Sequence, residues 1–152
     1  MLGRPSPPPR HRLDEAMSQE NIEIVRRIYT ERLLDRDPRG FVDHFAAPDI
    51  EYVDPPDEVD PGSRHGRTEV MLALRRARQS FIEYQHELHE LFDDGDTVVA
   101  AVRFHGKTQR GNKRDVIQKE EAHVWRFRDG KVVSFENGRD LKEALEAAGL
   151  SE

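Results

Sequence analysis

The chain has 152 residues, the size of a single domain, and its 24 Lys and Arg against 30 Asp and Glu give a formal net charge of −6. An acidic chain lacks the basic face of a general nucleic-acid binder, and its apolar runs are far shorter than the roughly 20 residues of a membrane helix, so neither nucleic acid nor membrane is expected as a partner. The absence of Cys excludes disulfides, thiolate metal sites and a cysteine nucleophile.

Residues 1–17 differ in composition from the rest of the chain. They begin with a proline-rich stretch, and proline, which has no N–H donor and a fixed φ, is excluded from helix interiors and central strands. We therefore expect a disordered Pro/Arg-rich extension over 1–17 and one folded domain over 18–150. No apolar stretch follows the arginines as it would in a secretory signal, so a cytoplasmic location is expected.

Three helices are predicted in the first half of the domain. Ser18 is the expected N-cap of a helix over 18–36, in which apolar residues recur every three or four positions. Asp37 and Pro38 begin a short second helix, because Asp caps and Pro suits the first turn. A third helix is predicted over 67–80.

Antiparallel strands are predicted from residue 81 onward, where apolar residues alternate. Asp129-Gly130 between two apolar runs is a strong hairpin signal. A C-terminal helix begins at Asp140, which has capping-box spacing to a glutamate, and ends at Gly149. The predicted strands are 50–54, 82–92, 97–105, 114–128 and 131–137, with a loop over 55–66 and a polar connection over 106–112.

Helices followed by antiparallel strands indicate an α+β architecture. We expect a cone-shaped fold, in which a curved antiparallel sheet carries the N-terminal helices on its concave face. Such a cone encloses a cavity that suits a small apolar molecule.

Four segments of the chain resemble the nuclear-transport-factor-2-like superfamily, in its SnoaL-like and ketosteroid-isomerase-like branch. They are LLDRDPRGFVDHFAAPDIEYVDP at 33–55, the helix led by Gly66, HVWRFRDGKVVSF at 123–135 and EALEAAGL at 143–150. The resemblance covers about 130 of the 152 residues. It is specific for the superfamily, whose members include isomerases, cyclases, epoxide hydrolases, dehydratases and binding modules.

The resemblance implies three catalytic positions. Ketosteroid isomerases place a tyrosine on the first helix, where this chain has Tyr29, and a general-base aspartate before a proline at the end of the first strand, where it has Asp54. Their second acid lies on the long strand, and here that position holds His123. SnoaL-like cyclases similarly carry a histidine near this position but pair it with an aspartate on the last strand, where this chain has Asn137.

The alternation of a strand adds candidate ligand-binding residues. Glu121, His123 and Trp125 point to one face of the long strand, and Phe135 and Asn137 share a face of the next. If these faces look into the cone, the expected ligand-binding residues are Trp125, Phe135, Glu121 and Asn137. No cofactor is expected and no metal site, since His86 and His89 of an H-x-x-H pattern point to opposite sides of a strand.

These residues support proton transfer at a carbon beside a carbonyl group. A carboxylate among apolar groups has a raised pKa, so Asp54 can act as the base, while Tyr29 and His123 donate hydrogen bonds to the enolate oxygen. Structural interpretations remain open for all three. Asp54 can cap the turn before two prolines, Tyr29 can be a core tyrosine, and His123 can be a core histidine.

Three functions are therefore compatible with the sequence. The first is a cofactor-independent isomerase, cyclase or lyase that acts on a small apolar carbonyl compound. The second is a non-catalytic binding protein for a small apolar ligand, and the third is a dimeric interaction module with a filled cone. A homodimer through the outer sheet face is expected because that face would carry exposed apolar residues, namely Val116, Ala122, Val124 and Val132.

Overall fold

The computed structural model of the chain describes residues 10–54 and 62–150, with side chains from Ser18 onward except those of 138–139. Of the extension predicted over 1–17, residues 1–9 lie outside this part, and residues 10–17 belong to the first helix. The described elements are α1 (Arg10–Thr30), α2 (Leu33–Arg36), α3 (Pro38–Phe45), β1 (Ala46–Asp54), β2 (Gly62–His65), α4 (Arg67–Gln79), β3 (Glu83–Asp94), β4 (Thr97–Arg110), β5 (Lys113–Arg128), β6 (Lys131–Arg139) and α5 (Leu141–Ala148).

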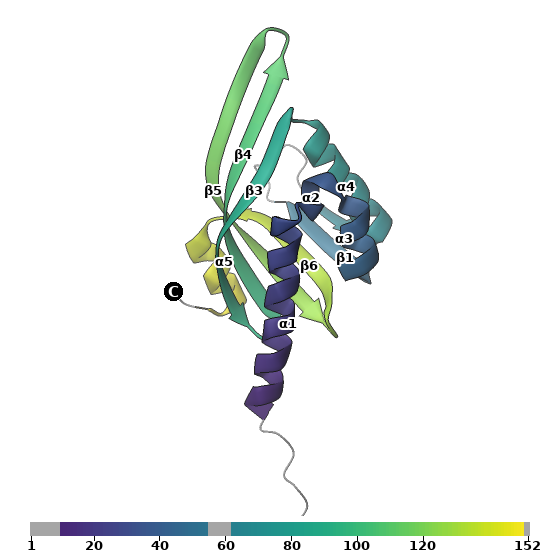
Figure 1. Cartoon of the computed structure of the whole chain (residues 1–152), viewed down its shortest axis with the longest axis vertical. Coiled ribbons are helices and arrows are strands. Elements are labelled where there is room, and N and C mark those ends of the chain that lie inside the picture. The colour runs from purple at the N-terminus through teal and green to yellow at the C-terminus, as the bar shows by residue number, and fades with distance from the viewer. Residues whose placement is uncertain (1–9, 55–61, 151–152) are drawn as a thin grey trace, which may run out of the picture.

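The described strands form one six-stranded sheet in the order β2-β1-β6-β5-β4-β3. All neighbouring pairs are antiparallel except β1 and β6, which run parallel, so the sheet is mixed. The helices α1 to α4 pack on one face, and α5 packs on the other (Figure 1). The predicted α+β architecture, with N-terminal helices on a curved sheet, is confirmed. None of the described helices is long and apolar enough to cross a membrane.

The single helix predicted over 18–36 is in fact two helices. α1 begins at Arg10 rather than at Ser18, whose hydroxyl donates instead to the Asp93 carboxylate on β3. The helix is interrupted at Arg32, which has a left-handed φ of 55°. The Arg32 guanidinium bonds the Tyr84 carbonyl at 2.9 Å, so a tertiary contact compensates for the interrupted helix.

β4 and β5 form a long hairpin that projects beyond the body of the molecule (Figure 1). β4 continues to Arg110, so the polar connection predicted over 106–112 is wrong apart from the turn at 111–112. Gly106 is needed within this strand, because a Cβ there would lie 2.7 Å from the Phe104 ring. The loop predicted over 55–66 is wrong for residues 62–65, which form β2 and pair with β1, and residues 55–61 lie outside the described part.

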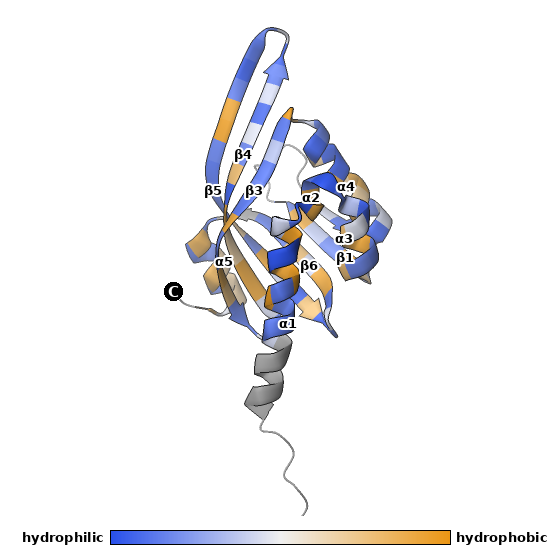
Figure 2. Ribbon diagram, viewed as in Figure 1, coloured by the Kyte–Doolittle hydropathy of each residue, from blue (hydrophilic) through white to orange (hydrophobic). Residues whose placement is uncertain are grey.

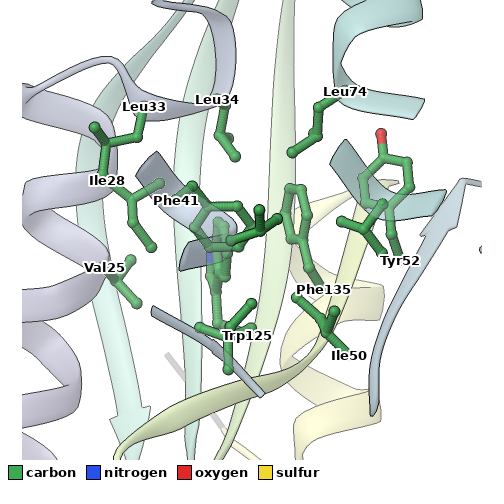
Figure 3. Packing of buried hydrophobic residues seen from close by; sticks show 14 of the residues in the cluster. Val25, Ile28, Leu33, Leu34, Phe41, Ile50, Tyr52, Leu74, Trp125 and Phe135 are labelled. Carbon is green, nitrogen blue, oxygen red and sulfur yellow. The ribbon is translucent and has the colours of Figure 1, made fainter. Parts of the chain in front are cut away.

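The core lies between the concave face of the sheet and the helices (Figure 3). The Trp125 and Phe135 rings stack with centroids 4.0 Å apart, and Phe41 of α3 meets Trp125 edge-on at 5.8 Å. A register shift between β5 and β6 pairs Phe127 with Val132 and brings Val132 into this core. The prediction that Val132 lies on the outer face is therefore wrong.

α5 covers part of the outer sheet face. Ala144 and Leu145 of α5 pack on Ala122 and Val124, which are fully buried. A bulge in β3 turns Phe92 toward this second cluster, although its alternation predicted the same face as His86. The expected exposed apolar surface is therefore largely covered within the chain. Val116, on the hairpin that is mostly hydrophilic in Figure 2, is 66% exposed.

Candidate functional site

A cavity of about 440 Å³ opens between α4 and the concave face of the sheet. Its apolar wall includes Ala73 of α4, Phe81, Phe104 of β4 and Ile117 of β5. Its polar wall combines aromatic hydroxyls, carboxylates, an imidazole, an amide and two cations. With Ser80, these polar residues are Tyr52, Asp54, Arg76, Tyr84, His86, Lys119, Glu121 and Asn137.

Asp54 is held at the end of β1 by one residue of its own strand and one from each of the two neighbouring strands, β2 and β6. The Tyr52 hydroxyl donates to its Oδ1 at 2.9 Å, and the Asn137 amide of β6 donates to the same oxygen at 3.2 Å. The Arg64 guanidinium of β2 lies 3.7 Å from Oδ2. The parallel register of β1 and β6 pairs Tyr52 with Phe135, which brings Asn137 beside Asp54. The carboxylate is thus fixed in the cavity wall, with its two oxygens in different surroundings.

His123 lies behind the cavity wall and has no exposed surface. Its Nδ1 is 2.5 Å from the Tyr29 hydroxyl oxygen, which also accepts a hydrogen bond of 3.0 Å from the Trp125 indole. The indole N–H can only donate, so the tyrosine hydrogen is left to point at Nδ1. With Nδ1 as an acceptor, the ring carries its hydrogen on Nε2, which donates to Glu121 Oε2 at 3.0 Å.

Glu121 is the centre of the buried polar cluster. Besides His123, its carboxylate meets Lys119 Nζ at 3.2 Å and His86 Nε2 at 3.5 Å. Burial acts to raise the pKa of Glu121, but the hydrogen bonds of His123 and His86 outweigh it, so the pKa is lowered and the group is ionised. Burial lowers the pKa of His86, which keeps that imidazole neutral. Burial likewise raises the pKa of Tyr29 well above its usual value.

The structure divides the predicted catalytic residues between two places. Asp54 lines the cavity, whereas Tyr29 and His123 are bonded to each other in the wall behind it. Glu121 is the link, because it lines the cavity and accepts from His123.

The predicted ligand-binding residues are divided in the same way. Glu121 and Asn137 line the cavity. Trp125 and Phe135 stack on each other in the core and are at most 2% exposed, so they support the site from beneath.

The three basic residues of the cavity wall were not selected from the sequence. His86 was considered only with His89, and the structure separates them: His86 is buried in the wall, and His89 is exposed beside Glu87. Arg76 of α4 carried no signal in the sequence, and Lys119 carried none beyond its alternation with Glu121. Alternation could have selected His86, since it shares a strand face with Tyr84.

A family model described as SnoaL-like domain matches residues 25–135. The chain is also similar to solved structures of NTF2-like proteins. One, from Burkholderia thailandensis E264, is 30% identical with a TM-score of 0.67, covering 82% of this chain and 95% of that one. Another, of unknown function from Burkholderia pseudomallei K96243, is 26% identical with a TM-score of 0.68, covering 84% and 95%. TerC, co-crystallised with polyporic acid, is 24% identical with a TM-score of 0.64, covering 84% and 96%. No curated protein matches the chain.

Proposed function

The chain belongs to the SnoaL-like domain family, and from this membership and the cavity we propose that it binds a small, mainly apolar carbonyl compound and transfers a proton on it. The observation that carries the proposal is the Asp54 carboxylate in the wall of a 440 Å³ cavity. This volume lies in the range of small-molecule sites. A pure interaction module would have a cone filled by side chains, which does not agree with a cavity of this size.

Asp54 is the proposed base. Two donors on Oδ1 orient the carboxylate, and the apolar wall formed by Phe81, Phe104 and Ile117 favours a ligand with a hydrophobic body. The base removes a proton from a carbon beside the carbonyl, and the negative charge that develops on the oxygen is stabilised by a cation of the wall. Lys119 is proposed for that role because its ammonium lies at the cavity wall.

Tyr29 and His123 are proposed as positioning residues. Both are buried behind the wall, and they act on the cavity through the hydrogen bond from His123 to Glu121. This role replaces the direct contact with substrate that the resemblance implied for them.

A non-catalytic binding protein is the second candidate. It is favoured by one observation: among the three residues implied by the resemblance, only Asp54 lines the cavity. In this case the cavity would hold its ligand without turnover.

Exchange of protons for deuterium separates the two candidates. The protein is incubated in D2O with cyclohexanone and acetophenone, and loss of the proton signals beside the carbonyl is followed by NMR. A catalyst accelerates exchange, and Asp54→Asn is expected to slow it by about 100-fold or more, the range for a lost general base. Ligand-detected NMR measures binding in the same samples.

Asp49→Asn is the matched control, because Asp49 also lies on β1 but is exposed and paired with Arg128 outside the cavity. It is expected to leave both exchange and binding unchanged. Binding without exchange in the unmodified protein, retained in Asp54→Asn, establishes the second candidate. Equal exchange by Asp54→Asn and the unmodified protein would rule out Asp54 as the base.

A further inference from the structure

Two histidines and one glutamate meet on the cavity wall in a way that proton transfer by Asp54 does not use. They are His86 of β3 and Glu121 and His123 of β5, and all three are at least nine-tenths buried. One ligand atom from each lies within 4.8 Å of the other two. We propose that His86, Glu121 and His123 bind a divalent transition metal ion. Zinc is the ion that suits these three ligands best.

The sheet register explains how these side chains meet. β3 and β5 flank β4 and are therefore about 9.6 Å apart, twice the spacing of neighbouring strands. Glu121 and His123 lie opposite Val102 and Ala100 of β4, whose short side chains leave room on the concave face. Long side chains from both outer strands can therefore meet above β4, and His86 reaches Glu121 there.

Two of the three separations between the ligand atoms suit one ion, and the third, between the two imidazoles, is at most 4.8 Å. Ligands at about 2.1 Å around a tetrahedral zinc ion lie about 3.4 Å from each other. Glu121 Oε2 is 3.0 Å from His123 Nε2 and 3.5 Å from His86 Nε2, on either side of that value. Because Glu121 and His86 also line the cavity, a fourth position on the ion would face the space available to a ligand. Three protein ligands and one open position are typical of catalytic rather than structural zinc.

The donor set selects the class of ion. Two imidazoles and one carboxylate favour zinc or a neighbouring first-row ion over calcium or magnesium, which prefer oxygen donors throughout. Lys119 bonds Oε1 of Glu121 and leaves Oε2 as the oxygen shared with the histidines.

Tyr29 would complete the site from behind. Its oxygen lies beside His123 Nδ1, so it holds the ring with Nε2 directed at Glu121. When Nε2 binds a metal, the imidazole hydrogen must move to Nδ1, where the Tyr29 oxygen accepts it and the hydroxyl hydrogen rotates away. This rearrangement costs the same free energy whichever ion binds, so it lowers the affinity of the site without selecting among ions.

The test uses the full chain, freed of metal with a chelator and then titrated with zinc against a chromophoric competitor. We expect one zinc per chain, and X-ray absorption of the loaded protein should show nitrogen and oxygen neighbours at about 2.0–2.1 Å, including two imidazoles. This measurement on the unmodified protein does not depend on any variant folding. Absence of stoichiometric binding, or a zinc shell without two imidazoles, would overturn the proposal.

Variants locate the ion. His86→Gln and Glu121→Gln should each weaken zinc binding by more than about 100-fold, the upper effect of losing an outer-shell partner. The matched control is Glu87→Gln, because Glu87 stands between His89 and His105 in an exposed cluster of the same composition. Loss of binding in Glu87→Gln, or its retention in both cavity variants, would contradict the assignment. Asp54→Asn should bind zinc normally, so this test and that of the proposed base can fail separately.

Discussion

The Tyr29 hydroxyl joins helix α1 to the long strand β5. It accepts from the Trp125 indole and contacts His123 Nδ1, and all three side chains are buried. Water cannot replace any of these partners, so the hydroxyl satisfies two polar groups that would otherwise be orphaned in the core. A tyrosine on the apolar stripe of a helix thereby positions the side chains of a buried polar cluster through its hydrogen bonds.

Tyr29→Phe should destabilise the protein by about 2 kcal/mol or more, because it leaves both the Trp125 N–H and His123 Nδ1 unpaired. Tyr52→Phe is the comparison, since it removes a hydroxyl from Asp54, which retains Asn137 and Arg64 as neighbours. A loss of about 1 kcal/mol is expected there. Urea unfolding followed by circular dichroism measures both. An equal or smaller loss for Tyr29→Phe would contradict the role given to its hydroxyl.

Because the Tyr52 hydroxyl is buried, we also expect the protein to lose stability at alkaline pH. Burial, followed by the charge of Asp54, raises the pKa of Tyr52 well above its ordinary value of 10.0. Above pH 10 the unfolded chain releases this proton while the folded chain keeps it, so stability falls as the pH rises. Urea midpoints at pH 8, 10 and 11 should fall less steeply in Tyr52→Phe than in the unmodified protein. Parallel slopes would show that Tyr52 titrates alike in both states.

At the scale of elements, α5 determines which part of the outer sheet face meets solvent. Asp140 caps its first turn by accepting from the Glu143 N–H, as the capping-box spacing predicts. Gly149, with a φ of 72°, ends it in a Schellman motif, in which Leu150 N–H reaches the Leu145 carbonyl at 2.8 Å. These local signals position a helix whose apolar side covers Val124.

Asp140→Ala should destabilise the protein by about 1 kcal/mol, because it removes the acceptor for the Glu143 N–H. Asp140→Ser keeps an N-cap acceptor and should stay close to the unmodified protein. Thermal unfolding of the three proteins provides the measurement. If the serine variant lost as much stability as the alanine variant, the cap would not be the cause.

At the scale of the molecule, the outer face beyond α5 is polar. Ion pairs link neighbouring strands across it: Arg103 with Glu120, His105 with Glu87, and Lys107 with Glu83. Two of the apolar residues that motivated the homodimer, Ala122 and Val124, are instead buried within the chain. The homodimer stays a prediction, and an interface on this face would depend on charge.

Light scattering at about 100 μM is expected to give twice the chain mass of 17.6 kDa. Arg103→Glu should shift the mass toward that of one chain, because it reverses a charge at the centre of this face. Arg39→Glu, a comparable change on an exposed side chain of α3, should not. A single-chain mass for the unmodified protein at this concentration would exclude the dimer.

The local features of the fold were readable from the sequence because they depend on short-range chemistry. Periodicity placed α4 and the strands, Asp37 and Asp140 capped the helices as predicted, and the motifs around Asp54 and His123 identified the family. Three of the errors fell where a long-range contact overrides a local preference: the break at Arg32, the bulge that turns Phe92 outward and the register shift that buries Val132.

The sequence by itself determined the α+β class and the family, and it predicted Asp54, Glu121 and Asn137 as site residues, which line one cavity. Only the tertiary structure decided that Tyr29 and His123 lie behind the wall and that His86 meets Glu121 across β4. The physical reason is that alternation assigns a side chain to a face, whereas the register between strands distant in sequence fixes which side chains on that face touch.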